Sequence, residues 1–279
     1  MFRERGVEIK TPEQIDTMRR AGLVVGETLD LLRRAVRPGM STLELDRLAE
    51  ESIRGAGAVP SFLGYAHPPF PASICVSVND EVVHGIPGAR LVDDGDVVSI
   101  DCGAIVDGWH GDAALTVAVG EVASQTAELL RVTEEAMWRG IAAAALGGRV
   151  GDVSHAVESH VRHASGFGIV EEYTGHGIGS AMHQPPSVPN TGRPGKGARL
   201  VEGLALAVEP MVTAGEPWTR VDPDGWTVRT EDGSLAAHFE HTFTITSTGT
   251  WVLTALDGGA ARLAELGVAY GGRQVEGTS

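Results

Sequence analysis

GDVVSID at residues 95–101 is a glycine followed by an apolar strand that ends in an acid, and the same form recurs as GLALAVE at residues 203–209. Each segment is followed by a second one in which an acid leads an apolar strand, Asp112 in the first half and Glu240 in the second. The repetition predicts two related halves that face each other across a pseudo-two-fold axis, with the acids meeting between them. Acids also recur at strand ends by chance, so the repeat alone leaves both explanations open.

The chain has 279 residues, of which 42% are hydrophobic, enough for one large domain or two fused halves. Its formal net charge of −15 repels phosphate backbones and anionic lipids, so nucleic acid and membranes are not expected partners. Cys75 and Cys102 are too few for a disulfide framework, and we find neither a signal peptide nor a run of about 18 apolar residues. We therefore expect a cytoplasmic protein.

Helix and strand signals alternate along the chain. Thr11-Pro12-Glu13-Gln14 predicts a capped helix that ends at Arg37-Pro38-Gly39, and Ser41 caps a second helix in the same way. The alternating residues of 73–87 predict a hairpin with its turn at Asn79-Asp80. The patterns that follow predict paired strands at 95–101 and 111–119, a capped helix at 124–146, a helix at 152–164, and strands and turns over 167–253. This mixture predicts an α+β fold with helices covering one side of a sheet.

The apolar strands carry four acids, which are Asp101, Asp112, Glu209 and Glu240. Any one of them alone is more simply explained as a turn cap or a solvated rim residue. Together in one apolar site, ionised carboxylates would repel each other and would be costly to desolvate. Two divalent cations would neutralise all of them, and the sequence therefore predicts a two-metal site.

His176 adds one nitrogen to this oxygen-rich set, which suits Mn, Fe, Co or Zn. The glycines of Gly175-His176-Gly177-Ile178-Gly179 let the backbone approach a neighbour closely on either side. Their spacing lacks the pattern of a dinucleotide-binding or phosphate-binding loop. Among the other histidines, His84 and His183 are candidates to point into the same cleft. His110, His238 and His241 flank the proposed ligands and are expected to support them.

Six motifs occur in order along the chain: Val83-His84-Gly85-Ile86-Pro87, Ser99-Ile100-Asp101, Trp109-His110-Gly111-Asp112, Gly175-His176-Gly177-Ile178-Gly179, Ala207-Val208-Glu209-Pro210-Met211 and Phe239-Glu240-His241-Thr242. Together they resemble the consecutive signatures of type I methionine aminopeptidases, from about Thr11 to Leu253. The resemblance implies the α+β pita-bread fold of creatinase and the aminopeptidases, a pseudo-two-fold antiparallel sheet covered by helices. It divides the chain into an N-terminal lead (1–10), a single catalytic domain (11–255) and a C-terminal tail (256–279).

The resemblance also implies a metal ligand at each matched position. Asp101 binds one of two divalent ions, which are Co, Mn, Fe or Zn. His176 and Glu209 bind the other ion, and Asp112 and Glu240 bridge both.

The same resemblance implies the position of the substrate pocket. Tyr65, Phe70, Cys75 and Trp226 fall where the family lines its methionine pocket. Such a pocket is apolar and closed, so an unbranched thioether side chain can fill it. Two departures concern its shape: Met182 stands where an aromatic residue is common, and the loop between Tyr65 and Phe70 is longer than usual.

The implied activity is removal of the initiator methionine from nascent proteins with a small second residue, through a dinuclear metal-bound hydroxide. Glu209 would relay a proton towards the leaving amine. His183 would stabilise the oxyanion, and His84 would contact the scissile amide, so both histidines would bind substrate. The expected partners are the N-termini of nascent polypeptides, including chains still at the ribosome, and the protein is expected to be a monomer.

Two rival functions share these features. A proline-directed peptidase of the same fold uses a similar ligand set, but such relatives usually carry a large extra N-terminal domain, and this chain starts almost at the catalytic one. A non-catalytic binding protein of this fold would be expected to have lost ligands, whereas every ligand is present here. Methionine aminopeptidase activity is therefore the function we expect.

Overall fold

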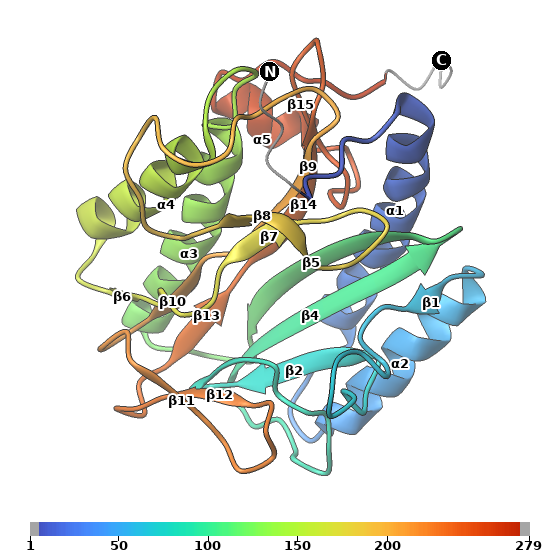
Figure 1. Ribbon diagram of the computed structural model, residues 1–279. Coiled ribbons are helices and arrows are strands. Elements are labelled where there is room, and N and C mark those ends of the chain that lie inside the picture. Colours follow the sequence, from blue (N-terminus) through green and yellow to red (C-terminus); the bar gives the residue numbers. More distant parts are fainter. Residues whose placement is uncertain (1–5, 274–279) are drawn as a thin grey trace.

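The computed structural model describes residues 6–273 of the chain (Figure 1). Its helices are α1 (Pro12–Ala35), α2 (Thr42–Gly55), α3 (Ser124–Ala142), α4 (Val150–Ala164) and α5 (Ala260–Glu265). The helices predicted before residue 167 are confirmed, with α3 ending a turn earlier than expected. Within this part of the chain, no helix combines the length and the apolar character that a membrane span requires.

Most strands join one large sheet whose central pairings are antiparallel. Its strands run in the order β1 (Val59–Pro60), β4 (Val97–Val106), β5 (Trp109–Ala118), β14 (Glu240–Ile245), β9 (Ala205–Val208), β7 (Gly175–Gly177) and β8 (Gln184–Val188), with β2 (Ile74–Val78) beside β4 and β15 (Thr250–Val252) beside β14. One small sheet contains β13 (Ala236–His238), β10 (Met211–Thr213) and β6 (Gly168–Ile169), and another contains β11 (Thr219–Val221), β12 (Val228–Thr230) and β3 (Glu81–Val83).

The centre of the large sheet is a hairpin longer than the sequence analysis predicts. β4 and β5 pair over their whole lengths. Asp107 and Gly108 connect them with φ angles of 49° and 81°, the left-handed conformation that a two-residue Asp-Gly hairpin turn requires. Asp101 and Asp112 therefore lie inside strands, and the prediction that they sit at strand ends is wrong.

The strand order agrees with two related halves. β4 and β5 of the first half correspond to β9 and β14 of the second, and β5 pairs with β14 where the halves meet. The helices follow the same division, because α1 and α2 pack against the first half and α3 and α4 against the second. Figure 1 shows the two helix pairs flanking the sheet at opposite sides of the molecule. The predicted α+β architecture is confirmed.

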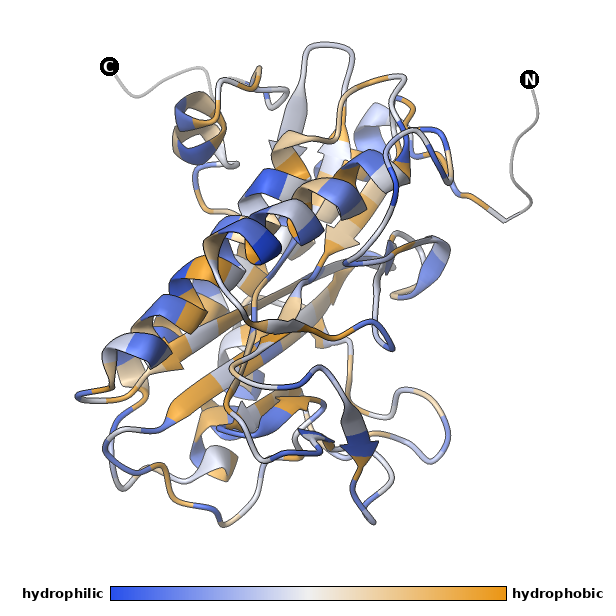
Figure 2. Ribbon diagram, turned by 90° about the vertical axis from the view of Figure 1, so that its left-hand side faces the viewer, coloured by the Kyte–Doolittle hydropathy of each residue, from blue (hydrophilic) through white to orange (hydrophobic). Residues whose placement is uncertain are grey.

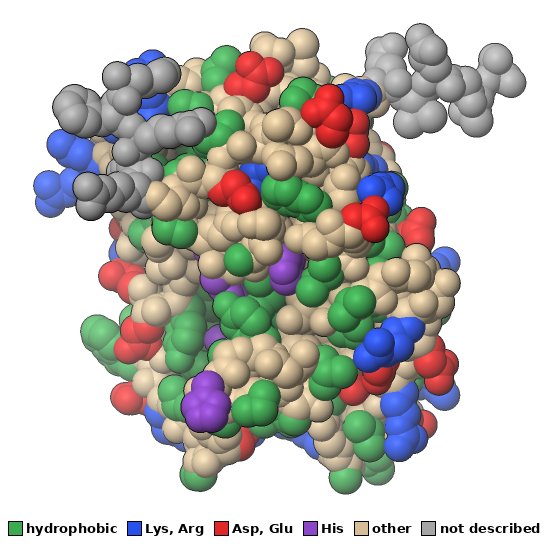
Figure 3. Space-filling model, turned by 45° about the vertical axis from the view of Figure 1, so that its right-hand side comes forward, with side chains coloured by type: hydrophobic (Ala, Val, Ile, Leu, Met, Phe, Trp, Pro, Cys, Tyr) green, Lys and Arg blue, Asp and Glu red, His purple; other side chains and the backbone are tan. Residues whose placement is uncertain are grey.

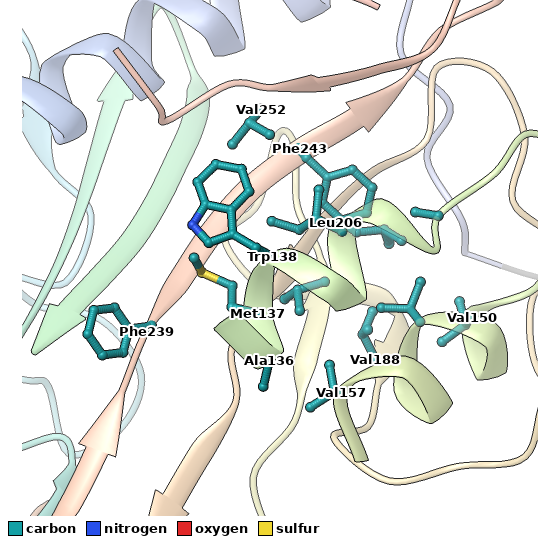
Figure 4. Close-up of a cluster of buried hydrophobic side chains, with 14 of the residues drawn as sticks. Ala136, Met137, Trp138, Val150, Val157, Val188, Leu206, Phe239, Phe243 and Val252 are labelled. Atoms are coloured by element: carbon teal, nitrogen blue, oxygen red, sulfur yellow. The ribbon is translucent and has the colours of Figure 1, made fainter. Parts of the chain in front are cut away.

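Each helix pair buries an apolar stripe against its own half of the sheet. Val25 and Leu32 of α1 belong to a core cluster with β2, β4 and β5. The matching cluster of the second half, shown in Figure 4, contains Met137 and Trp138 of α3 and Phe243 of β14. Figure 2 shows hydrophobic helix residues turned towards the sheet and hydrophilic ones turned outward. Burial of side chains of this size contributes about 1.5–3 kcal/mol each, so these cores hold the sheet in place.

The predicted caps are present in α1 and α2 but not in α3. The side chains of Thr11 and Ser41 each accept a hydrogen bond from a backbone N–H of the first turn, and the capping boxes of both helices are complete. Ser124 is the first residue of α3, and Ala123 occupies the N-cap position without a side-chain hydrogen bond. The cap predicted for this helix is therefore wrong, because alanine has no group that can accept the bond.

The hairpin predicted for residues 73–87 is wrong in its pairing. β2 and β3 flank the predicted turn, but β2 pairs with β4 and β3 pairs with β12. The Val76 N–H donates to the Gly85 carbonyl at 2.9 Å, which brings the end of the segment back beside β2. Alternation along the sequence indicates strands without identifying their partners, because strand pairing depends on packing with distant segments.

Segments on either side of the central region also contact it. The Lys10 N–H donates to the Gly203 carbonyl at 2.9 Å. After β15 the chain forms α5 and then returns, so that Tyr270 bridges Thr250. The predicted lead and tail include residues 1–5 and 274–279, which lie outside the described residues.

Replacing Gly22 of α1 should destabilise the fold. A Cβ there would lie 2.2 Å from the Leu253 carbonyl oxygen, so the backbone must move to accept it. Gly22→Ala should lower the free energy of unfolding by about 1–3 kcal/mol, the usual range for overpacking. Gly55 at the end of α2 is a matched control, because a Cβ there meets open space. Urea unfolding should find Gly55→Ala as stable as the wild type or slightly more so; equal stabilities for the two variants would contradict the close approach.

Candidate metal centre and substrate cleft

The register of the large sheet places three acids in one row. On β4 and β5, Asp101 is opposite Ala114, and Ala114 is opposite Glu240 on β14. The register of β14 with β9, continued by one residue, sets Glu209 opposite Glu240. Because neighbouring strands are about 4.8 Å apart, the row brings the carboxylates together. The small side chain of Ala114 leaves room between them.

Asp112 lies on the same face of the sheet, two residues from Ala114 on β5. Asp112 and Glu240 are only 3% and 2% exposed. One carboxylate oxygen of each, and one of Asp101, is buried without a hydrogen-bond partner in the described part of the chain. Buried polar atoms normally have partners, and no Lys or Arg of the residues that the structure describes lines the cavity beside them. These orphaned oxygens fit a cation as the missing partner.

The electrostatics of the carboxyl groups agree with a missing positive charge. Burial raises the pKa of the Asp101 carboxyl to about 7. Burial is also the largest cause of the raised pKa values of Asp112, Glu209 and Glu240, and the neighbouring carboxylates raise them further. A bound divalent cation would reverse this by favouring the ionised forms.

His176 joins the carboxylates from β7. Its Nε2 lies 3.4 Å from Glu209 Oε1 and 3.9 Å from Glu240 Oε1. Its Nδ1 is 3.0 Å from the Gly177 carbonyl oxygen, which makes Nδ1 the donor and leaves a lone pair on Nε2. Burial lowers the pKa of His176 to about 3, so the ring is neutral. Asp112, His176 and Glu240 thus offer ligand atoms within 4.8 Å of one another.

The glycines beside His176 allow two close backbone approaches. A Cβ at Gly175 would lie 2.3 Å from the Ala207 carbonyl oxygen, and a Cβ at Gly177 would lie 2.3 Å from the Pro185 carbonyl oxygen. The predicted close approach is confirmed on both sides. The backbone of two neighbouring segments, at Ala207 and Pro185, packs directly against these glycines and holds His176 in the sheet.

The structure brings all the predicted site residues to one cavity of about 290 Å³. The metal-ligand candidates that line it are Asp101, Asp112, His176, Glu209 and Glu240, and the other predicted residues that line it are His84, His183, Tyr65, Phe70, Cys75 and Trp226. Figure 3 shows histidine side chains in the hollowed centre of one face, with hydrophobic side chains around them. The cavity therefore joins a charged region to an apolar one.

The apolar region is a compact cluster of side chains. Phe70 and Trp226 pack edge to face with their ring centroids 5.1 Å apart. Phe62 and Met182 belong to the same cluster. The Phe70 N–H donates to the Tyr65 carbonyl at 2.9 Å, so the long loop closes into a turn that forms part of the wall. An enclosure of this composition suits an unbranched apolar side chain.

Trp226 is carried by the connection between β11 and β12, and one arginine fixes that connection. Arg229 of β12 donates to Asp222 at 2.5 Å, to Asp80 at 2.8 Å and to Glu81 at 2.6 Å. Asp80 and Glu81 belong to the turn before β3 and to β3 itself, so the arginine links two distant parts of the chain. The connection that holds Trp226 is thereby tied to β3 and to the turn between β2 and β3.

His84 and His183 are held by aromatic neighbours. The φ angle of His84 is 60°, a left-handed conformation that is uncommon outside glycine, and its ring packs edge-on against Tyr173 at 5.7 Å. Burial lowers the pKa of His84 to about 4. The Tyr65 hydroxyl lies 2.6 Å from Nδ1 of His183, whose ring centroid is 4.3 Å from that of His176. Desolvation lowers the pKa of His183 as well, so both rings are neutral near pH 7.

Sequence analysis missed several residues of the cavity wall: Phe62, Val83, Glu172, Tyr173, Thr174 and Met211. The run Glu172-Tyr173-Thr174 directly precedes the glycine-bracketed His176, and this adjacency was an available signal. Phe62 gave no such signal, because only the pairing of β1 with β4 brings its segment to the cleft.

Of the histidines that flank the ligands, one approaches them closely. His238 Nε2 lies 3.7 Å from Glu209 Oε2. His110 does not line the cavity. His241 turns away from it and hydrogen-bonds to Thr254, because successive residues of β14 face opposite sides of the sheet. The prediction that His241 supports the ligands directly is wrong.

Comparison with known proteins places these features in a family. Residues 16–247 match the model of metallopeptidase family M24. The methionine aminopeptidase of Clostridium acetobutylicum is 49% identical over 247 residues, which cover 88% of this chain and 98% of that protein. The crystal structure of a methionine aminopeptidase from Thermotoga maritima has a TM-score of 0.87 and 42% sequence identity, and the match covers 89% of this chain and 99% of that one.

A prolidase from Pyrococcus furiosus also has a similar fold. Its TM-score is 0.69 at 21% sequence identity, and the match covers 88% of this chain and 65% of the prolidase. At this identity the likeness concerns the fold alone. The pita-bread fold expected from the sequence is confirmed by these structural neighbours together with the family match.

Asp101→Asn should stabilise the metal-free protein, and should do so more at high pH. The folded pKa of about 7 lies above the ordinary value of 3.8. Between these two pH values the Asp101 carboxyl is ionised in the unfolded chain but still protonated in the folded protein. The free energy of unfolding of the wild type therefore falls as the pH rises from about 3.8 to about 7. Urea unfolding in EDTA at about pH 5 and about pH 8 should show the larger gain for the variant at the higher pH. A gain that shrinks as the pH rises would contradict the raised pKa.

Proposed function

This chain belongs to metallopeptidase family M24, and on that premise we propose that it removes the initiator methionine from new proteins at a two-metal site. The observation that carries the proposal is one cavity in which a buried row of carboxylates with orphaned oxygens adjoins an apolar pocket. The reaction is hydrolysis of the first peptide bond, which releases free methionine and a shortened chain. Its enzyme class is metal-dependent aminopeptidase, in agreement with the family.

The buried acids and His176 would hold two divalent cations. Asp112 and Glu240 lie on the paired strands at the centre of the sheet and would be shared by the two ions, and Asp101 on one side and Glu209 on the other would complete the carboxylate set. When bound, such ions supply a nucleophile from water at neutral pH and neutralise charge on the reacting carbonyl. A set of carboxylates with imidazole suits Co, Mn, Fe or Zn, and metal availability decides among them.

The chain's own groups would handle protons and orientation. Glu209, at the edge of the row, can take a proton from the attacking water and pass it to the leaving amine. His183 is neutral and is fixed through Nδ1 by the Tyr65 hydroxyl, so it can donate from Nε2 to the oxygen that gains negative charge. His84, held against Tyr173, would contact the scissile amide.

The apolar region would bind the methionine side chain. Phe70, Trp226 and Met182 enclose this apolar region. Cys75 lies opposite Asp101 in the pairing of β2 with β4, where the apolar and charged regions meet. A thioether chain fills irregular apolar space well and contacts aromatic edges favourably. Because bulky rings already surround this end of the cavity, little space remains for a large second residue.

A proline-directed peptidase is the second candidate, since prolidases share the fold. The likeness to the Pyrococcus furiosus prolidase is limited to the fold at 21% identity. The enclosed cluster around Phe70 and Met182 favours methionine at the first position over a general residue before proline. We therefore rank methionine removal first.

The setting of the reaction follows from its substrate. Initiator methionine is present on chains as they leave the ribosome, so we propose that the protein acts on nascent N-termini in the cytoplasm, as a monomer. The net charge of −15 disfavours direct binding of nucleic acid or of anionic membranes, which leaves the polypeptide itself as the partner.

Tripeptides would test the substrate assignment. In protein stripped of metal and reloaded with cobalt, Met-Ala peptides should be cleaved readily, Met-Val peptides more slowly and Met-Lys peptides hardly at all, because the crowded cavity repels a large second residue. The measurement is kcat/KM for each peptide.

Two outcomes would contradict this account. Equal kcat/KM values across the three peptides would remove the steric argument for the second residue. Cleavage of Leu-Ala or Leu-Pro peptides as fast as Met-Ala would remove the methionine pocket, and the second of these would favour the proline-directed peptidase.

Variants of a ligand and a non-ligand should differ in metal content. Glu240→Ala should lose bound metal and activity while the fold survives, because the helices and sheet do not depend on that side chain. His183→Ala should keep its metal and lose about 10²–10³ in kcat, the usual effect of removing an oxyanion donor. Elemental analysis beside the kinetics separates the two roles. Metal lost from His183→Ala, or retained with normal turnover in Glu240→Ala, would show that the roles are misassigned.

A further inference from the structure

His238 is a buried imidazole that the mechanism above does not use. It is 2% exposed, and its Nε2 has no hydrogen-bond partner among residues 6–273. This nitrogen lies 3.7 Å from Glu209 Oε2 and 4.0 Å from Glu240 Oε2. Both distances exceed the roughly 3.2 Å upper limit of an ordinary N–H···O bond, so His238 is not simply a donor to either carboxylate.

The position of His238 mirrors that of His176. His176 Nε2 approaches the Oε1 atoms of Glu209 and Glu240, whereas His238 Nε2 approaches the Oε2 atoms of the same two residues. Ligands at about 2.0–2.2 Å from one ion lie roughly 3–4 Å from each other, which matches these separations. Glu209, His238 and Glu240 form a group whose ligand atoms lie within 4.8 Å of one another.

The backbone holds His238 in this place independently of any ion. The Thr116 hydroxyl donates to the His238 carbonyl at 2.7 Å and accepts from the His238 N–H at 2.9 Å. The pairing of β13 with β10 sets His238 opposite Met211, two residues after Glu209. The backbone that carries the ring is therefore held beside Glu209 before a metal ion arrives, as a preorganised metal site requires.

We propose that His238 binds, through Nε2, the ion that Glu209 and Glu240 hold, as an additional protein ligand. The inference rests on the metal site of the proposed function. A second imidazole shifts the site towards metals that prefer nitrogen, such as Co, Fe and Zn, and away from Mn, which prefers oxygen ligands.

Proton NMR of the cobalt-loaded full-length protein tests the coordination directly. An imidazole bound to paramagnetic cobalt gives an exchangeable N–H resonance far outside the normal range. The wild type should show one such resonance from His176 and one from His238, and His238→Gln should lack one of them. A single resonance in cobalt-loaded wild type would overturn this inference while leaving the metal site intact. Failure to bind cobalt at all would overturn both.

Calorimetric titration of the metal-free variants supplies a second readout. Gln keeps a hydrogen-bond donor and removes the imidazole, so His238→Gln should weaken cobalt binding beyond the roughly 10–100-fold that losing a merely supporting group costs. Manganese binding should weaken less. His110→Gln is the matched control, since His110 belongs to neither group of potential ligand atoms in residues 6–273 and its Nδ1 lies 3.0 Å from Ser61 Oγ, and it should bind cobalt as the wild type does. Cobalt affinity of His238→Gln within about 100-fold of the wild type is what loss of a merely supporting group gives, and it would overturn the proposal; if that variant does not fold, the wild-type NMR result decides.

Discussion

Repulsion among buried carboxylates is the constraint on which the site depends. Asp101, Asp112, Glu209 and Glu240 face one cavity, and burial raises the pKa of each carboxyl group. Nothing in their mutual interaction holds them together, because ionised neighbours repel and neutral ones leave oxygens without partners. The register of the sheet holds them, and the apolar cores on either side stabilise that register. Cations complete the arrangement and do not create it.

The two halves contribute similarly to the acids at the centre of the sheet but differently to the walls of the cleft. Each half contributes acids from its own strands to the seam between β5 and β14. The walls of the cleft come from less regular parts: the turn that begins at Tyr65, and the β11–β12 connection that Arg229 anchors. The sheet thus fixes the positions of the acids, while the connecting segments determine the shape of the cleft.

Neutral histidines suit the chemistry of such a cleft. Burial lowers the pKa values of His84, His176 and His238 well below 7, so each ring has a lone pair on one nitrogen and a hydrogen on the other. His176 and His238 approach opposite oxygens of Glu209 and Glu240, whereas His84 stands beside the apolar pocket. Under the proposed function the same residue type would serve the metal and the substrate, and its position would decide which.

The sequence by itself determined the features that local patterns encode. Capping residues defined the starts of α1 and α2, the repeat of a glycine, an apolar stretch and an acid predicted two halves, and the ordered motifs indicated a methionine aminopeptidase. Caps, periodicity and motif spacing each act over a few residues. Only the tertiary structure decided which strands pair with β2 and β3, that Asp101 lies within a strand, and that Phe62 reaches the cleft. It also decided that His238 approaches the carboxylate of Glu209 while His241 turns away. Strand pairing joins distant segments, and the resulting register fixes the face on which each side chain lies.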